Sequence, residues 1–363
     1  MSTRRSPIII RPSRRRQESK QQIEQRKQRA LLVAAAIAIF FILAIPAYGY
    51  WSNFIAPPRS VVLQVDNNEY TLGFMADYLI GVQNLTGPLN MSKEPIALLS
   101  MLQQNELVKS GTERKGITIP TDELDKEIKE RMIGNSPQFA DLPEDQVERE
   151  FNEAYIQYLD TSNLSEEEHR DLVRNNLLKE KLKDSLGDDI PTSSKQAKMS
   201  WIVIPSKREE GEDAMIASQK AVETVSRGLE IGEDFTVLAE KYSQDRNTAV
   251  NGGYYGWVAE GAFGILDETI FSLSDGETSE AIETGDTTYF FRVSETEEDR
   301  MIDEEMLDRL KEVALLEWLR EEQGNHRITS CFGGGSAGGP CDWQIDWLTK
   351  RVRTALPEDV SQQ

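Results

Sequence analysis

The sequence predicts an α+β fold behind one N-terminal membrane-spanning helix. Residues 30 to 58 contain no charged side chain and are rich in Leu, Ile and Phe. Residues 94 to 186 repeat apolar positions at helical spacing, with many charges between them. Residues 199 to 204 are a buried-strand run, and helical and strand patterns follow it in mixed order.

The N-terminal segment has the charge pattern of a membrane anchor. Residues 1 to 29 carry ten Lys and Arg against two Glu, and a run of about 20 apolar residues can cross the hydrocarbon core as a helix. We expect a basic cytoplasmic tail over 1–29 and a transmembrane helix over 30–51, where Tyr48, Tyr50 and Trp51 are typical of the membrane interface. The positive-inside rule then places the remaining chain outside the cytoplasm. A cleaved signal peptide is the main alternative.

Charge and composition exclude several function classes. The first 30 residues have a net charge of +8 and the whole chain has −21, so the exported part is strongly acidic and poorly suited to nucleic acid. The two histidines, His169 and His326, and the two cysteines lie too far apart in sequence for the usual metal-ligand cluster. We expect no metal and no cofactor, and both histidines at the surface.

A mainly helical region precedes the mixed part. A short hairpin is predicted from two strand patterns around Asp66-Asn-Asn-Glu69. Helices are predicted from Glu94 to Lys109, after Pro120 with Thr121 as N-cap, from about 144 to 159, and after the capping box Ser165-Glu-Glu-Glu168.

The region after Pro191 predicts an α+β domain. The strand pattern of residues 199 to 204 leads to helices over about 214–229 and 235–242, and then to strands near 254–258 and 288–293. An amphipathic helix follows, from Ile302 to about Leu319. It lacks a core of its own, so we expect it to pack back on the first helical region.

The two cysteines enclose a short glycine-rich stretch. Cys331 and Cys341 bracket residues 332 to 340, and in an oxidising compartment we expect them to form a disulfide. Two free thiols are the alternative.

Three blocks in the α+β region resemble the parvulin peptidyl-prolyl isomerase family, which is also called PpiC-like. They are Phe235-Thr-Val-Leu-Ala-Glu-Lys-Tyr-Ser-Gln-Asp245, Asn251-Gly-Gly-Tyr-Tyr-Gly-Trp257 and the stretch from Leu266 to Glu277. A second resemblance surrounds them, because residues 98 to 111 and 116 to 125 are similar to the N-terminal chaperone region of SurA-like and PrsA-like foldases.

These resemblances imply a domain plan. A SurA-like helical chaperone domain would occupy 60–190 and a parvulin-like domain 196–296. A helix over 300–323 would return to the chaperone domain. Residues 324–363 would be a glycine-rich, disulfide-closed loop and a C-terminal tail. The chain would then be a single-pass protein of the bacterial cytoplasmic membrane.

The resemblance also implies site residues. Parvulins use two inward-facing histidines, an acidic or cysteine residue and apolar residues that grip the proline ring. Here the histidine positions fall on Trp201 and Tyr289, the acidic position on Asp245, and the ring-gripping positions on Tyr255, Phe263 and Leu266. We expect Asp245 and Tyr289 in a catalytic role and the other four in substrate binding. Alternatively, Asp245 caps a loop and the aromatic and leucine residues are ordinary packing.

Two function classes follow from the resemblance. The chain is either a foldase that binds unfolded or proline-containing polypeptides and catalyses prolyl isomerisation, or a holding chaperone whose parvulin domain only binds peptides. An envelope scaffold with one dedicated partner is a third possibility. The oligomeric state is not predicted.

Overall fold

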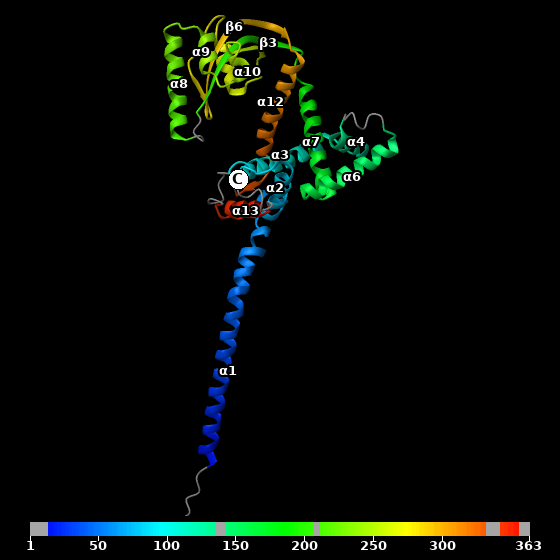
Figure 1. The fold of residues 1–363 in the computed structure, drawn as a ribbon, viewed down its shortest axis with the longest axis vertical. Helices are drawn as coiled ribbons and strands as arrows, with labels where there is room; N and C mark the ends of the chain where they lie inside the picture. The colour runs from blue at the N-terminus through cyan, green and yellow to red at the C-terminus, as the bar shows by residue number, and fades with distance from the viewer. Residues whose placement is uncertain (1–13, 135–141, 207–210, 332–341, 356–363) are drawn as a thin grey trace, which may run out of the picture. The chain divides into compact units, whose positions relative to one another are not determined.

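The computed structural model describes residues 14–134, 142–206, 211–331 and 342–355, and the chain divides into two compact units (Figure 1). The first unit comprises residues up to Leu99, Thr161–Leu164 and the chain from Thr329 onward. The second unit comprises Ser100–Asp160 and Ser165–Ile328.

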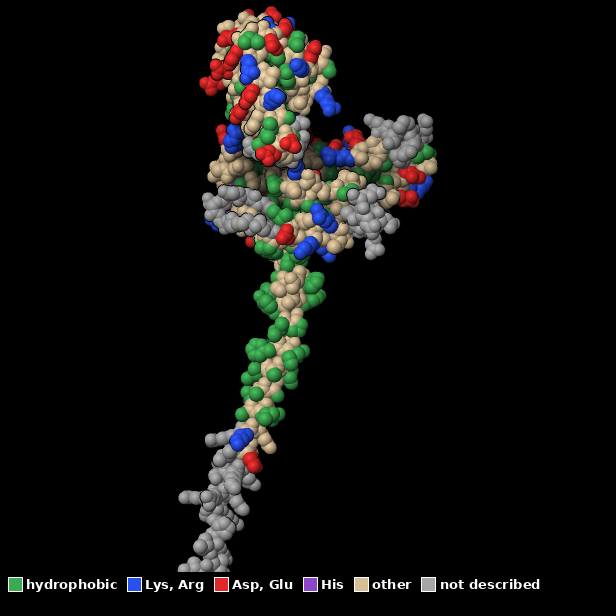
Figure 2. All heavy atoms as spheres, turned by 60° about the vertical axis from the view of Figure 1, so that its left-hand side comes forward, with side chains coloured by type: hydrophobic (Ala, Val, Ile, Leu, Met, Phe, Trp, Pro, Cys, Tyr) green, Lys and Arg blue, Asp and Glu red, His purple; other side chains and the backbone are tan. Residues whose placement is uncertain are grey.

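The first unit begins with a long helix, α1 (Arg14–Tyr50), which continues into a π-helical turn (Trp51–Ile55) and a 3-10 turn (Pro57–Arg59). The stretch Lys27–Ile55 is long and apolar enough to cross a membrane, and none of its most apolar window is buried. Figure 2 shows hydrophobic side chains covering this helix on the visible face. Exposed leucines and phenylalanines on every side are what a lipid-facing helix requires.

The remaining parts of the first unit are a small sheet and two helices. Strands β1 (Val61–Val65) and β2 (Asn68–Thr71) form the predicted hairpin, and β7 (Ile328–Ser330) pairs on the other edge of β1. Helix α2 (Leu72–Thr86) contacts α13 (Asp342–Thr354), and the buried Gln83 side chain donates a hydrogen bond of 2.9 Å to the carbonyl of Val352.

The second unit contains a helical cluster built from distant parts of the chain. Its helices are α3 (Glu94–Lys115), α4 (Thr121–Ile133), α6 (Glu144–Ser162), α7 (Glu166–Gly187) and α12 (Glu304–Gln323). Leu107, Leu182 and Leu315, from α3, α7 and α12, are fully buried against one another. The prediction that the late amphipathic helix packs on the earlier helices is therefore confirmed.

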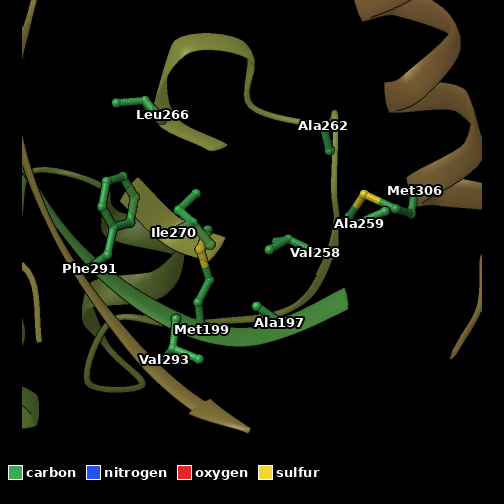
Figure 3. Close-up of a cluster of buried hydrophobic side chains, with 10 residues drawn as sticks. All are labelled: Ala197, Met199, Val258, Ala259, Ala262, Leu266, Ile270, Phe291, Val293 and Met306. Carbon is green, nitrogen blue, oxygen red and sulfur yellow. The ribbon is translucent and has the colours of Figure 1, made fainter. Parts of the chain in front are cut away.

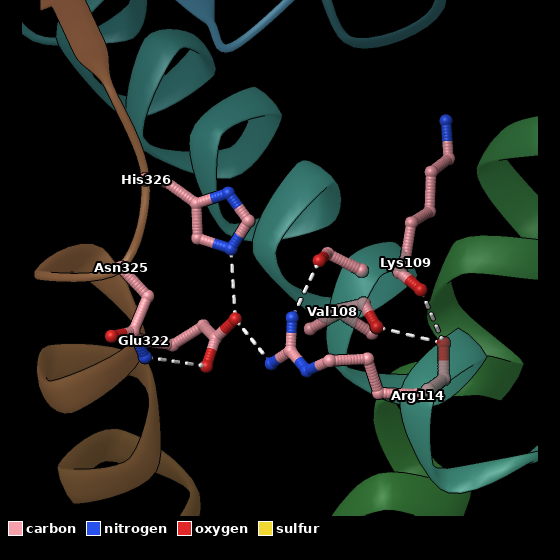
Figure 4. A network of polar contacts seen from close by, with 8 residues as sticks. Val108, Lys109, Arg114, Glu322, Asn325 and His326 are labelled. Carbon is pink, nitrogen blue, oxygen red and sulfur yellow. Dashed lines mark hydrogen bonds and ion pairs between the residues drawn. The ribbon is translucent and has the colours of Figure 1, made fainter.

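A buried carboxylate joins the ends of α3 and α12 (Figure 4). Glu322 is 4% exposed and forms an ion pair with Arg114, and His326 Nε2 lies 2.8 Å from the same carboxylate. Burial raises the pKa of Glu322, but hydrogen bonds from Arg114, His326 and Asn325 outweigh it, so the pKa lies below its usual range.

The α+β domain is a four-stranded antiparallel sheet with helices on both faces. Its strands are ordered β4 (Tyr254–Ala259), β3 (Ser193–Pro205), β6 (Thr287–Met301) and β5 (Ile282–Thr284). Its helices are α8 (Glu212–Glu230), α9 (Phe235–Tyr242), α10 (Arg246–Ala249), a 3-10 turn (Gly264–Leu266) and α11 (Asp267–Ser272). This arrangement confirms the predicted fold class.

The two faces of this sheet have separate cores. Ile202, Ile204 and Phe290 pack against α8 and α9 on one face. Met199, Phe291 and their neighbours pack against α11 on the other (Figure 3), and Met306 from α12 belongs to this second core. Alternation along β3 and β6 separates the two sets, because successive strand residues point to opposite faces.

Several sequence expectations need correction. Thr121 begins α4, but it is Pro120 that occupies the N-cap position and no side chain caps the helix. Residues 324–363, expected to be loop and tail, contain β7 and α13. His169 is 5% exposed and the His326 side chain 8%, so neither histidine is at the surface. Both have polar partners that compensate for burial, which the sequence pattern does not reveal.

Candidate functional site

The two residues at the expected histidine positions lie on one face of the sheet. Trp201 of β3 is paired with Phe291 of β6, and Tyr289 is paired with Val203, so Trp201 and Tyr289 are diagonal neighbours. Their ring centroids are 6.1 Å apart, and both side chains are half-buried. Tyr289 also stacks on Phe291 with centroids 6.0 Å apart. The face is thus an aromatic surface that rests on the core shown in Figure 3.

Three further predicted residues extend this surface. Tyr255, on β4, has its ring centroid 4.8 Å from that of Trp201. Phe263, just before the 3-10 turn, lies 5.8 Å from Trp201 and 5.4 Å from Tyr255, in edge-to-face geometry. Leu266 ends that turn and is buried in the underlying core. We call Trp201, Tyr255, Phe263 and Tyr289 the aromatic cluster.

Asp245 joins the aromatic cluster through a hydrogen-bonded triangle. The Trp201 Nε1 group donates to Asp245 Oδ2 at 2.9 Å and to Thr248 Oγ1 at 3.0 Å, and Thr248 Oγ1 donates to Asp245 Oδ2 at 2.7 Å. Asp245 Oδ1 accepts from the backbone N–H of Asn247 at 3.2 Å, which caps α10. The capping role considered for Asp245 is therefore present.

The triangle keeps Asp245 ionised. Partial burial raises the pKa of its carboxyl group, but the hydrogen bonds from Thr248, Trp201 and two backbone amides more than offset this, and the pKa lies below its usual value. Asp245 is consequently a negatively charged acceptor at neutral pH and is not a proton donor.

The backbone around this triangle is tightly packed. Trp201 N donates to the carbonyl of Gly253 at 2.8 Å, and Gly253 has a positive φ of 81°. A Cβ atom at this position would clash with the Trp201 carbonyl oxygen and would lie 3.0 Å from Ala239 Cβ. Gly253 thus lets the chain pass directly beneath Trp201.

Sequence reasoning did not find three residues that shape the site. Thr248 completes the triangle described above. Arg309, from α12, places its guanidinium carbon 3.9 Å from the Phe263 ring centroid and donates Nε to the carbonyl of Ala262 at 3.0 Å. Asp267 accepts a hydrogen bond from the backbone N–H of Phe263 at 3.1 Å. The pKa of its carboxyl group is raised, chiefly because the group is buried. Arg309 lies 46 positions beyond Phe263, so no local pattern predicts the contact.

The chemistry available here is that of a binding surface with two available hydroxyls. Among the described residues, neither the Tyr255 nor the Tyr289 hydroxyl has a hydrogen-bond partner, whereas the Trp201 donor is already engaged. Within the residues that the structure describes, no group of three or more His, Cys, Asp and Glu side chains is arranged to hold a metal ion. The structure gathers the six predicted site residues, but their roles in binding and catalysis stay predictions.

The predicted disulfide lies away from this site in the chain. Cys331 follows β7, and its backbone N–H donates to the carbonyl of Val62 at 2.9 Å. Cys341 is outside the described residues, so the pairing stays a prediction.

Comparison with known proteins places the aromatic cluster in a recognised domain. The family model described as PPIC-type PPIASE domain matches residues 185–297. A foldase protein PrsA of Geobacillus kaustophilus is 27% identical over 206 residues, which are 56% of this chain and 70% of that protein. A foldase protein PrsA of Geobacillus sp. (strain WCH70) is 29% identical over 136 residues, 37% of this chain and 48% of that protein. The crystal structure of peptidylprolyl isomerase PrsA from Bacillus anthracis matches 64% of this chain and all of its own, with 17% identity and a TM-score of 0.38.

Proposed function

We propose that the chain is a foldase that binds proline-containing segments of unfolded exported proteins while anchored in the membrane. The match of residues 185–297 to the PPIC-type domain and the similarity to a foldase protein PrsA support this proposal. The anchor would be residues 30–51, with the basic N-terminus in the cytoplasm. The apolar, exposed α1 supports this, as does the charge difference between its two sides.

The aromatic cluster is the observation that carries the proposal. Four half-buried rings from β4, β3, β6 and the segment before the 3-10 turn meet on one face of the sheet. Aromatic-lined surfaces bind proline-rich segments because the proline ring is apolar and already restricted in conformation. Leu266 and Phe291 support the rings from below, so the surface is preformed and loses little entropy when a peptide binds.

The same surface can lower the barrier to prolyl isomerisation. That barrier, about 18–20 kcal/mol, comes from amide resonance, and the twisted amide is less polar than the planar one. A dry aromatic surface favours the twisted state, and the Tyr289 hydroxyl can donate to the prolyl nitrogen, whose lone pair is released from resonance as the amide twists. Asp245 would act indirectly, because it fixes the orientation of the Trp201 ring. The activity would therefore depend on shape and desolvation.

A peptide-binding module without catalysis is the second candidate. The hydrogen bonds of Trp201, Asp245 and Thr248 favour it, because these polar groups are already paired with one another. In that case the domain would hold an unfolded segment and leave its proline isomers to interconvert at their own rate.

The test measures both properties on the full chain in lipid nanodiscs. Exchange NMR gives the cis–trans rate of a proline-containing peptide, and light scattering follows the aggregation of an unfolded client. Tyr289→Phe removes the hydroxyl that is proposed to donate, and Tyr254→Phe removes a hydroxyl from an exposed residue outside the aromatic cluster. We expect Tyr289→Phe to slow the catalysed exchange by about 2–10-fold, the worth of one hydrogen bond, and the control to leave it unchanged.

The other outcomes separate the two candidates. Suppressed aggregation without accelerated exchange would establish the holding module. If the full chain neither accelerates exchange nor suppresses aggregation, both candidates are wrong. Asp245→Ala should lower the catalysed rate by loosening Trp201, and it should leave suppression of aggregation largely intact.

A further inference from the structure

A groove of about 1040 Å³ lies within the first unit, beside the end of the apolar helix. One wall is the chain from Ser52 to Pro58, which follows the aromatic residues at the end of α1. The opposite wall is α13, which contributes Trp343, Asp346, Trp347, Lys350 and Arg351, and Asp77 of α2 also lines the groove. The proposed binding of proline-containing segments does not use this groove.

The length of the apolar segment places the groove at a defined depth. An α-helix rises 1.5 Å per residue, so a hydrocarbon core of about 30 Å takes about 20 residues. Counted from Ala30, the first residue after the last charge of the basic tail, the core ends near Gly49. Ser52, Asn53 and Phe54 then lie within the next 5–7 Å or so, which is the headgroup layer.

The side chains of the groove fit that layer. Trp343 is 50% exposed and Phe54 67%, although both belong to a folded unit. Exposed aromatic rings, and tryptophan above all, are typical of the boundary between headgroups and acyl chains. These two side chains therefore favour a lipid over a fully soluble ligand.

The charge of α13 is opposite to that of the exported part. After Asp346, residues 347–355 contain Lys350, Arg351 and Arg353 and no acidic residue, whereas the chain beyond residue 30 is strongly acidic. In the part of the chain that the structure describes, neither Lys350 nor Arg351 forms an ion pair. Two available cations beside exposed aromatic rings are suited to a phosphate that carries acyl chains.

We infer that this groove binds the headgroup of an anionic phospholipid in the outer leaflet of the membrane that anchors the chain. Lys350 and Arg351 hold the lipid phosphate, and Trp343 and Phe54 lie against the glycerol and upper acyl region. The inference rests on the proposed membrane anchoring. It adds a specific lipid site through which the membrane fixes α13 and the C-terminal part of the first unit.

The test compares two arginines of one helix. Both Arg351 and Arg353 are exposed in the last turn of α13, but only Arg351 lines the groove. The full chain is placed in nanodiscs of phosphatidylglycerol and phosphatidylcholine in equal amounts and extracted with mild detergent. Native mass spectrometry then counts the lipids that each chain retains. We expect retention of phosphatidylglycerol over phosphatidylcholine, a loss of about fivefold or more in Arg351→Glu, and less than about twofold in Arg353→Glu.

Each remaining outcome has a distinct meaning. If Arg351→Glu and Arg353→Glu lose equal amounts of phosphatidylglycerol, the lipid is held by general surface charge and the groove is not a specific site. Displacement of the lipid by inorganic phosphate would also overturn the lipid site, and so would equal retention of phosphatidylglycerol and phosphatidylcholine. Lys350→Glu is a second variant, expected to behave like Arg351→Glu. If the wild-type chain fails to enter nanodiscs of phosphatidylcholine alone, it is the anchoring proposal that fails.

Discussion

Gly253 sets the distance between the β4 turn and Trp201, so its substitution tests how strongly the site depends on the backbone. A methyl group at this position meets the Trp201 carbonyl, and the φ of 81° is itself unfavourable for alanine. We expect Gly253→Ala to reduce the free energy of unfolding by about 2–4 kcal/mol, measured by urea denaturation followed by tryptophan fluorescence.

A second glycine separates the two causes. Gly276 has a similar φ of 86°, but a Cβ atom there would have no neighbour within 4 Å. Gly276→Ala should therefore cost only the conformational part, about 1–2 kcal/mol. Equal costs for the two variants would mean that the close approach to Trp201 contributes nothing.

The residues of the site differ in how far the sequence could reveal them. Trp201, Tyr255, Phe263 and Tyr289 could be predicted because the resemblance to parvulins assigns a family position to each, although only Tyr255 lies inside one of the three blocks that carry the resemblance. Thr248 lies three residues after Asp245 and could have been noticed as a helix-cap partner, but its bond to Trp201 depends on how α10 packs on β3. Long-range pairing of this kind has no signal in a single sequence.

The α6–α7 helix pair contains a buried histidine that makes its stability pH-dependent. His169 Nδ1 lies 3.0 Å from the Tyr155 hydroxyl, and the Tyr158 ring packs against the imidazole. Burial, and then the charges of Arg131 and Arg170, lower the pKa of His169 below its ordinary 6.5. The unfolded chain therefore takes up a proton first as the pH falls, and stability is lost from about pH 6.5 downward to the folded pKa.

Hydrogen exchange checks this expectation. Protection of the α6 and α7 amides, corrected for intrinsic exchange rates, should fall between pH 7 and pH 5. In His169→Gln it should change little with pH, from a starting value about 1–3 kcal/mol lower because the buried ring contacts are lost. The chain has one other histidine, so His326→Gln is the matched control. The prediction is wrong if the pH dependence of α6 and α7 disappears in the control and persists in His169→Gln.

Among the elements, the sequence predicts best those with clear periodicity and caps. The capping box at Ser165 and Glu168 is present, and the helix it begins extends to Gly187. Helix α2 was not predicted because Leu72-Gly-Phe-Met-Ala begins it with apolar residues on several sides and a glycine. Helix α13 was missed because a glycine-rich stretch precedes it, and such a stretch favours the interpretation of a loop.

At the scale of the whole molecule, α12 belongs to two hydrophobic clusters. Its first turn contributes Met306 to the core beneath the aromatic cluster, and its later turns contribute Leu315 and Leu319 to the helical cluster of α3 and α7. The sequence predicted the second contact but not the first. A parvulin-like domain over 196–296 ends before Met306, and domain limits drawn from motif positions cannot include a side chain supplied from outside the motifs.

The shared helix predicts a specific pattern of destabilisation in the full chain. Met306→Ala should lower the stability of the α+β domain by about 2–5 kcal/mol, because it empties part of a buried core. Leu319→Ala, 13 residues later on the same helix, should have a similar cost in α3 and α7. Hydrogen exchange resolved by peptide distinguishes the two. We expect Met306→Ala to reduce protection in β3, β4 and β6, and Leu319→Ala to reduce it in α3 and α7. Uniform loss of protection in both variants would instead mean that the second unit unfolds as one cooperative structure, in which the α+β insert has no stability of its own.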